Sequence, residues 1–471
     1  MRAGSFTGAL LLVACECMVS PAYHRPTIET PSAWRFVDSS EKESINAVFW
    51  EQFGDTTLDS LIVWALRNNE NVAIAAGRVE EFAGILQSTR SALFPQIGAG
   101  TDDGRGRFFN EGTFLGPVSS YALALSGSWQ LDLFGGLRRA TQAARADLLS
   151  SREAQRGVLL SVVGAVAAGY MHLAVLDEEL AITQSTATSR KETYELFTRQ
   201  FERGVISELE LRQAESEYEL ALAGIPQLEK AIAQQENALS VLLGRNPGLI
   251  PRGKRLQELA PPVVPTGLPS SLLKDRPDIR QSEQDLIAAN ARIGVAYASY
   301  FPSLSLTGLF GWASNELRNL VAKPNIIWSY AGSLDEPIFT GGERHGQVLS
   351  AKAVYRQALA RYRLSIVNGF REVEDALIDQ QKTKEEIEAL SAQTEALRKA
   401  AYLAKLRYTN GYTSYIEVLD AERSLFNAEL TLAQARETLL DALVNLYIAF
   451  GGGGWAGKAE QLLKGAEEYT K

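Results

Sequence analysis

Cysteine and histidine are scarce in this chain of 471 residues, and their scarcity excludes two ways of holding a fold together. The only cysteines, Cys15 and Cys17, lie near the N-terminus, so no disulfide framework can stabilise the rest of the chain. The three histidines, His24, His172 and His345, show no spacing typical of a metal site. The net charge of −9 leaves no basic excess for binding nucleic acid. We therefore expect no metal, no other cofactor and no nucleic-acid partner.

Proline is missing from two long stretches. All 16 prolines lie at or before Pro337, and none lies between Pro117 and Pro226. Because proline disrupts a helix interior, residues 137–201 and 344–408 can each form one helix of roughly 100 Å. No single-domain core covers so long a helix, so apolar spacings of three and four predict a seam against other helices. In the first tract the seam comprises Leu159, Val162, Val163, Val166, Tyr170, His172, Leu173 and Leu176.

Long apolar runs are also lacking. No uninterrupted run of 18 apolar residues exists, so no membrane-spanning helix is expected. Membrane strands remain possible, because they alternate and leave a weak hydropathy signal. Residues 121–133 alternate in this way over about the length of a tilted membrane strand. Their apolar face is Tyr121, Leu123, Leu125, Trp129, Leu131 and Leu133, against Ala122, Ala124, Ser126, Ser128, Gln130 and Asp132. The edge of a soluble β-sandwich is the alternative.

The chain contains an internal repeat. The Phe-Pro pairs at residues 94–95 and 301–302 each end an alanine-containing helix and precede an alternating segment. These pairs lie 207 residues apart, as do Gly204 and Gly411. Each copy is predicted to contain a helix, a β-hairpin (about 96–134 and about 303–339), a long helix and a returning helix. The expected domains are a signal peptide at 1–14, an extended arm at 15–56, the first repeat at 57–244, a proline-rich linker at 245–270, the second repeat at 271–451 and a tail at 452–471.

The four predicted strands of one chain cannot close into a barrel. Open strand edges are not stable in hydrocarbon, so several chains must combine their strands. Three chains would supply twelve. The small, polar inward face of these strands would leave a water-filled lumen.

Several segments resemble the TolC-like outer-membrane efflux proteins, in the lipoprotein branch that serves tripartite pumps. They are Arg-Pro-Asp-Ile-Arg at 276–280, Ala-Asn-Ala at 289–291, Phe-Pro at 301–302, Leu-Thr-Gly at 306–308, Trp-Gln-Leu-Asp-Leu-Phe-Gly at 129–135, Tyr-Ile-Glu-Val-Leu-Asp-Ala at 415–421 and Val-Asn-Leu-Tyr at 444–447. The resemblance implies an α+β membrane protein: a homotrimer with a 12-stranded β-barrel continued by a 12-helix α-barrel. It places the linker and the tail in an equatorial belt. The implied partners are outer-membrane lipid, a periplasmic adaptor and an inner-membrane pump.

The N-terminus resembles a bacterial lipoprotein signal. A short apolar segment ends in Leu-Val-Ala before Cys15, which predicts lipidation of that residue. Cys17 is the alternative, because the family spacing of proline and tyrosine starts there, at Pro21, Tyr23 and Pro26. A plain signal peptide is a further alternative.

The resemblance places a channel constriction near residue 416. Ile416 and Asp420 lie four apart on one helix face, and would supply an apolar and an acidic ring. Such a ring would favour cations. The equivalent residues of the first copy, Leu209 and Gln213, lack the acid. Alternatively, Asp420 only favours the dipole at a helix start.

The two helix reversals are predicted to contact the adaptor. They contain Arg203, Gly204 and Val205 in the first copy, and Asn410, Gly411 and Tyr412 in the second. Simple helix capping is the other interpretation, and the two are compatible.

The sequence therefore predicts a passive exit duct for small molecules, drugs or metal ions, and no enzyme. Two alternatives are the outer pore of a type I protein-secretion system and a non-conducting scaffold that spans the periplasm. The scaffold requires bulky residues on the inward face, which these strands lack.

Overall fold

The computed structural model describes residues 19, 22–35, 49–107, 109–110, 113–114, 117–259 and 272–452. Both cysteines, residues 260–271 of the linker and the tail beyond 452 lie outside this part. The chain divides into two compact units, each built from both halves of the sequence. Unit 1 is Met1–Ile28, Gly77–Arg152 and Gln281–Leu364, and unit 2 is Glu29–Ala76, Glu153–Arg280 and Ser365–Lys471.

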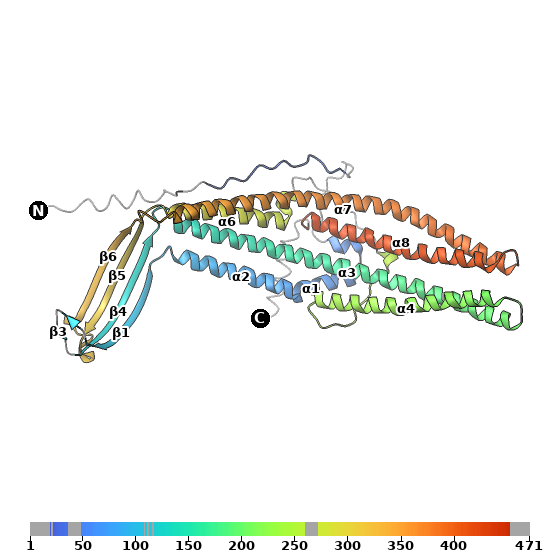
Figure 1. The fold of residues 1–471 in the computed structure, drawn as a ribbon, viewed down its shortest axis with the longest axis horizontal. Coiled ribbons are helices and arrows are strands. Elements are labelled where there is room, and N and C mark those ends of the chain that lie inside the picture. The colour runs from blue at the N-terminus through green and yellow to red at the C-terminus, as the bar shows by residue number, and fades with distance from the viewer. Residues whose placement is uncertain are drawn as a thin grey trace. The chain divides into compact units, whose positions relative to one another are not determined.

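Unit 1 contains one antiparallel sheet of four strands in the order β1-β4-β5-β6 (Figure 1). These are β1 (Gln96–Gly106), β4 (Val118–Leu131), β5 (Ser303–Ser314) and β6 (Ile326–Asp335). The strands fall where the alternation predicts them, and β4 pairs with β5, so both hairpins join one sheet. The first loop holds a short ribbon of β2 (Phe109–Asn110) and β3 (Thr113–Phe114).

The sheet leads into helix α3 (Gly136–Glu202) through a capped turn. β4 ends at Leu131, so Leu133 lies beyond the strand and the predicted apolar face is shorter than expected. The Asp132 carboxylate accepts hydrogen bonds from the backbone N–H groups of Leu137 (3.0 Å) and Arg138 (2.9 Å). It thereby satisfies donors that have no partner within the first turn of a helix.

Helix α6 (Pro277–Ala298) packs on α3 within unit 1. Arg292 pairs with Asp147 at 2.5 Å, and Ser150 donates to Asp285 at 2.6 Å. The helix ends at Ala298, close to the expected end at Phe301, because Pro302 disfavours helical backbone before it.

The single helix predicted before the first β-hairpin is two helices in the structure, so this prediction is wrong. The structure has α1 (Thr56–Asn68) and α2 (Glu70–Ser91), separated at Asn69, which is extended with ψ 126°. The Asn69 side chain accepts a hydrogen bond from the backbone N–H of Asn71 (2.9 Å) and donates to the carbonyl of Leu242 (2.7 Å). An asparagine that caps the second helix and bonds a distant one therefore divides the segment.

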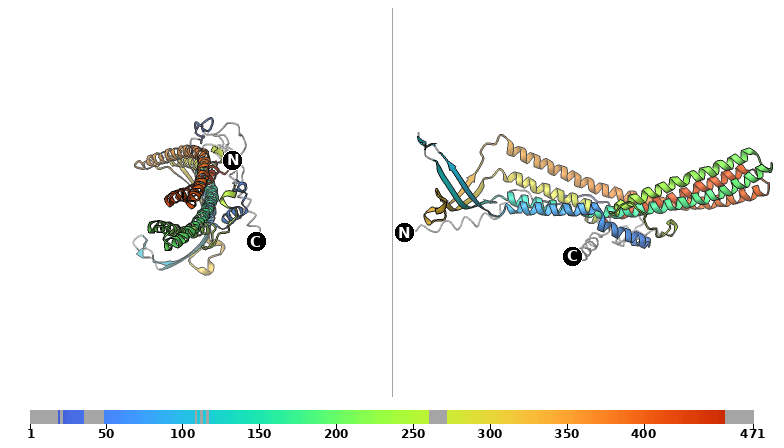
Figure 2. Two further views of the ribbon diagram at one scale, coloured as in Figure 1. Left: turned by 90° about the vertical axis from the view of Figure 1, so that its right-hand side faces the viewer. Right: turned by 90° about the horizontal axis from the view of Figure 1, so that it is seen from below.

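Unit 2 contains two antiparallel helix pairs, in which α4 returns along α3 and α8 along α7 (Figures 1 and 2). Helices α3 and α7 (Glu343–Thr409) have 67 residues each, and α4 (Glu208–Leu242) and α8 (Tyr415–Ala449) have 35 each. The described residues of unit 2 also form α5 (Leu272–Asp275) and the 3-10 turns η1 (Phe49–Phe53) and η2 (Leu256–Glu258). The loop between β5 and β6 in unit 1 holds two further 3-10 turns, η4 (Leu317–Asn319) and η5 (Lys323–Asn325).

The predicted seam on α3 is buried in the core of unit 2, with one exception. Val163, Val166 and Leu173 are almost fully buried, together with Leu440 and Val444 of α8. His172 does not join them, because its side chain is half-exposed and contacts Glu437. It lies at the polar border of the contact between α3 and α8, so its prediction as one of the apolar seam residues is wrong.

One window of 18 residues in α3 has a mean hydropathy of 2.0, which would suit a membrane helix by length and composition. No such helix was expected from the sequence. Of this window, 61% is buried inside the protein. A Cβ added to Gly164 of the same helix would collide with the side chain of Ile448 unless that side chain moved. Helix packing within unit 2 therefore accounts for its apolar character.

Candidate functional site

One face of the sheet is apolar across strands β4, β5 and β6. The register sets Leu123 beside Trp312, Leu125 beside Phe310, and Phe310 beside Trp328. Leu125 is 53% exposed and Trp328 67% exposed, so this face is not packed into the protein interior. On β4, β5 and β6 this face carries Tyr121, Leu123, Leu125, Trp129, Leu131, Leu304, Leu306, Phe310, Trp312, Ile326, Trp328, Tyr330 and Leu334. On β1 the same face carries Ile97 and Ala99, and becomes polar at Thr101, Asp103 and Arg105 toward the loop end. An apolar surface of this extent indicates contact with lipid or another chain.

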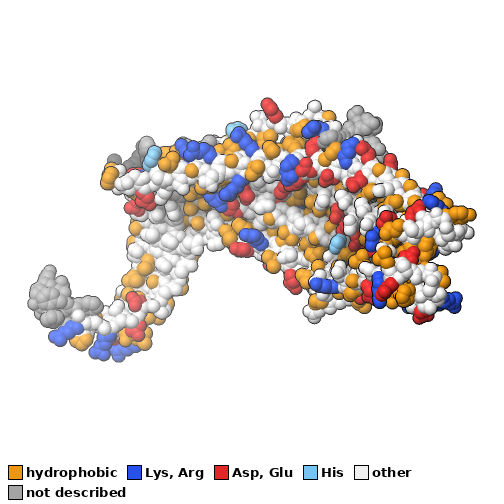
Figure 3. All heavy atoms as spheres, turned by 45° about the vertical axis from the view of Figure 1, so that its right-hand side comes forward, with side chains coloured by type: hydrophobic (Ala, Val, Ile, Leu, Met, Phe, Trp, Pro, Cys, Tyr) orange, Lys and Arg blue, Asp and Glu red, His pale blue; other side chains and the backbone are white. Residues whose placement is uncertain are grey.

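The opposite face of the sheet is mostly small and polar. Ser126 pairs with Gly98 on one side and with Leu309 on the other, and Gly311 lies between Ala124 and Ile327. Leu309 and Ile327 are its large apolar residues among the described strands, so this face carries few bulky apolar side chains. Figure 3 shows that charged side chains gather toward the loop end of the strands.

Both edges of this sheet are open. Strands β1 and β6 each pair on one side only among the described residues. Unpaired N–H and C=O groups along β1 and β6 are therefore available to further strands.

The two helix reversals form the same cap. Gly204 and Gly411 have positive φ angles of 69° and 76°, which favour glycine. Val205 N–H donates to the carbonyl of Gln200 at 2.9 Å, and Tyr412 N–H donates to that of Arg407 at 3.0 Å. These are the bonds of a Schellman motif. The side chains of Val205 and Tyr412 are 68% and 77% exposed, and Arg203 and Asn410 are exposed beside them.

Ile416 and Asp420 lie on an exposed face in the first turns of α8. Ile416 is 48% exposed, and Asp420 is exposed one turn further on. The opposite face of these turns packs into a small core that comprises Phe197, Leu211, Ala214, Ala404, Tyr415, Val418 and Leu419. This core fixes the direction in which the two side chains point. In the first repeat Leu209 is 67% exposed and Gln213 is partly buried.

A buried charge cluster next to Asp420 was missed by the sequence analysis. Glu217 of α4 is 2% exposed and lies between Arg190 of α3, at 3.0 Å, and Arg423 of α8. The hydrogen bond that Arg423 donates to Glu217 raises the pKa of the Arg423 guanidinium, and the charge of Asp420 raises it further. Burial raises the pKa of the neighbouring Glu422. The only signal in the sequence was the position of Glu217 between Ala214 and Ala221 on the apolar face of its helix.

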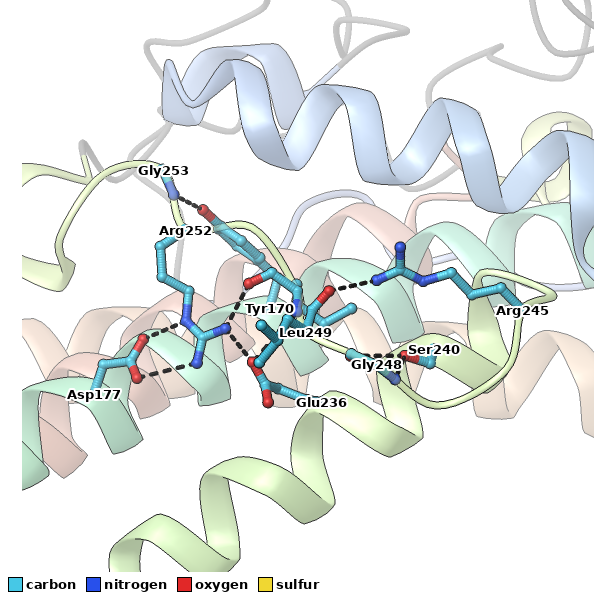
Figure 4. A network of polar contacts seen from close by, with 10 residues as sticks. Tyr170, Asp177, Glu236, Ser240, Arg245, Gly248, Leu249, Arg252 and Gly253 are labelled. Atoms are coloured by element: carbon cyan, nitrogen blue, oxygen red, sulfur yellow. Dashed lines mark hydrogen bonds and ion pairs between the residues drawn. The ribbon is translucent and has the colours of Figure 1, made fainter.

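A second network clamps the linker to the helices of unit 2 (Figure 4). Arg252 bonds Asp177 of α3 at 2.8 Å and Glu236 of α4 at 2.5 Å. The Tyr170 hydroxyl accepts a hydrogen bond from Gly253 N–H and donates to Asp55, both at 2.8 Å. The sequence predicted only a proline-rich linker here, because ion pairs between distant residues leave no local pattern.

Within the described residues, no group of three His, Cys, Asp or Glu side chains could hold a metal ion. Cys15 and Cys17 lie outside the described residues, so the structure does not place the predicted lipidation site.

The open apolar sheet and the long paired helices define a class, the subunits of membrane channels that continue into an aqueous compartment. The family described as outer membrane efflux protein matches residues 61–245 and 268–452, and the chain belongs to this family. It is a component of efflux systems in the bacterial outer membrane, and it extends into the periplasm.

Relatives match over nearly the whole chain. The chain is 33% identical to the solvent efflux pump outer membrane protein SrpC of Pseudomonas putida, covering 94% of this chain and 97% of SrpC. It is 32% identical to the cation efflux system protein CusC of Escherichia coli K12, covering 95% and 98%. The open state of the outer membrane channel MtrE of Neisseria gonorrhoeae has a TM-score of 0.83 at 32% identity, covering 93% and 99%.

Proposed function

We propose that three copies of this chain form a passive exit duct for small molecules. Each copy contributes four strands to a 12-stranded barrel in the outer membrane and four long helices to a 12-helix barrel in the periplasm. The observation that carries this proposal is the apolar sheet with two open edges, which one chain cannot close. A periplasmic adaptor and an inner-membrane pump deliver the solute and supply the energy, and the duct itself performs no catalysis.

The constriction of the duct is formed by Ile416 and Asp420. Their exposure on one face of α8, above a core that fixes the helix, supports this role. Three Asp420 carboxylates give the constriction a negative charge, which favours cations. The exposed reversals around Gly204 and Gly411 serve as the adaptor contact. A lipid on Cys15, or alternatively on Cys17, anchors the N-terminus in the outer membrane.

Recordings in planar lipid bilayers test the duct and its constriction. We expect the wild-type protein to conduct, and Asp420→Asn to lower the permeability of K⁺ relative to Cl⁻ severalfold, measured as the reversal potential in a KCl gradient. Asp420→Glu is the matched control, because it keeps the negative charge at the same position. It should leave the reversal potential unchanged.

The outcomes separate the two parts of the proposal. A wild-type protein without conductance contradicts the duct and favours a structural scaffold. Conductance with the same ion preference in wild type and Asp420→Asn contradicts only the acidic constriction.

A further inference from the structure

A histidine and two carboxylates meet where α3 packs against α8. The distance from His172 Nδ1 to Glu437 Oε1 is 2.5 Å. Asp441 lies four residues after Glu437, on the same face of α8. On the other side of Glu437, Gln434 donates a hydrogen bond to Glu179 of α3 at 2.9 Å. The polar contact therefore continues along the seam between these two helices.

The polar contact borders tightly packed apolar residues. Leu173 of α3 and Leu440 and Val444 of α8 are buried in the core of unit 2. The contact of Gly164 with Ile448 leaves no room for a Cβ further along the seam. A change of charge at His172, Glu437 and Asp441 therefore acts on closely packed helices.

Asp441 is in an unfavourable position for a charged carboxylate. It is half-buried, and its buried Oδ1 has no hydrogen-bond partner among the described residues. Two neighbouring groups act on its pKa, Glu437 on its own helix and His172 on α3. Burial raises the pKa of Asp441 to about 6, the charge of Glu437 adds to this effect, and His172 opposes it.

We propose that His172, Glu437 and Asp441 form a proton-binding site that tightens the packing of α3 against α8 in mildly acidic medium. At neutral pH, Glu437 and Asp441 repel each other across one helical turn. Binding of a proton by Asp441 removes that repulsion and neutralises a carboxylate that is poorly solvated.

The direction of the effect follows from proton linkage. The pKa of folded Asp441, about 6, exceeds the ordinary value of 3.8, so the folded state binds more protons between these two values. The stabilisation is complete below the ordinary pKa and is lost as the pH rises through about 6. Because α8 also carries Ile416 and Asp420, the site acts on the helix that bears the proposed constriction.

Hydrogen–deuterium exchange of the purified full-length protein between pH 5 and pH 8 tests this site. After correction for intrinsic exchange rates, we expect amides 434–446 of α8 to be about tenfold better protected at pH 5 than at pH 8. This factor follows from the rise of the Asp441 pKa from 3.8 to about 6 in the folded state. Asp441→Asn should be well protected at both pH values, because asparagine mimics the neutral acid. Glu437→Gln should move the midpoint to lower pH.

Two results would overturn the proposal. One is wild-type protection of these amides that does not change with pH. The other is a pH step of the same size in Asp441→Asn as in the wild type. Because exchange is measured without any transport, neither result depends on whether the protein conducts.

Discussion

At the scale of single residues, the stability of the tip of unit 2, the end that carries the reversals at Gly204 and Gly411, depends on Glu217. This carboxylate is buried between Arg190 and Arg423, so it joins three helices, α3, α4 and α8. The carbonyl of Glu217 also accepts a hydrogen bond from Arg190 at 2.9 Å. An unpaired arginine at this position would be costly, because a buried charge loses its hydration without compensation.

We expect Glu217→Gln to lower the stability of the tip by about 3–5 kcal/mol, the usual cost of breaking a buried ion pair. Faster hydrogen exchange of amides 208–222 would show this. Glu215→Gln is the matched control on the same helix, because its pair with Arg212 is exposed and should be worth less than about 1 kcal/mol. Equal exchange in both variants would contradict the role of Glu217.

At the scale of elements, the four long helices end in the same way. Gly204, Gly244, Gly411 and Gly451 follow α3, α4, α7 and α8, and all have positive φ. Such ends depend on the backbone of one residue and not on distant contacts. This explains why the glycines at 204 and 411 could be recognised in the sequence as helix ends.

We expect Gly411→Ala to destabilise the reversal by about 1–2 kcal/mol, the cost of a left-handed conformation for a residue with a Cβ. No atom lies within 4 Å of the added Cβ, so backbone strain alone is tested. Gly346→Ala, inside α7 and equally uncrowded, should instead stabilise its helix by about 0.5–1 kcal/mol. Limited proteolysis at the reversal should therefore be faster in Gly411→Ala than in the wild type, and no faster in Gly346→Ala. If Gly411→Ala and the wild type were cut at the same rate, this prediction would be wrong.

At the scale of the whole molecule, the faces and edges of the sheet determine which surroundings the protein requires. One face is apolar and exposed, the other is small and polar, and both edges are open. In the proposed trimer the first faces lipid, the second lines the lumen, and the edges pair with neighbouring copies.

Adjacent positions of β4 test this arrangement. Leu125→Arg should prevent insertion into lipid vesicles, because arginine on the lipid face costs about 2–4 kcal/mol per chain at the bilayer centre. Ser126→Arg, on the opposite face, should insert normally and alter the conductance. The measurement is vesicle insertion followed by single-channel recording. Normal insertion of Leu125→Arg would place this face away from lipid.

The sequence by itself determined the local features of this protein. Helix α7 was expected at 344–408 and is found at Glu343–Thr409, and the alternation located the strands. Periodicity, proline and glycine act over a few neighbouring residues, so they can be read without the fold.

Only the tertiary structure decided which distant residues meet. It paired β4 with β5, divided the first helix at Asn69, and turned His172 from the apolar seam toward Glu437. It also brought Glu217 to Arg423, 206 residues further along the chain. These contacts depend on the packing of separate helices and strands, which no local spacing encodes.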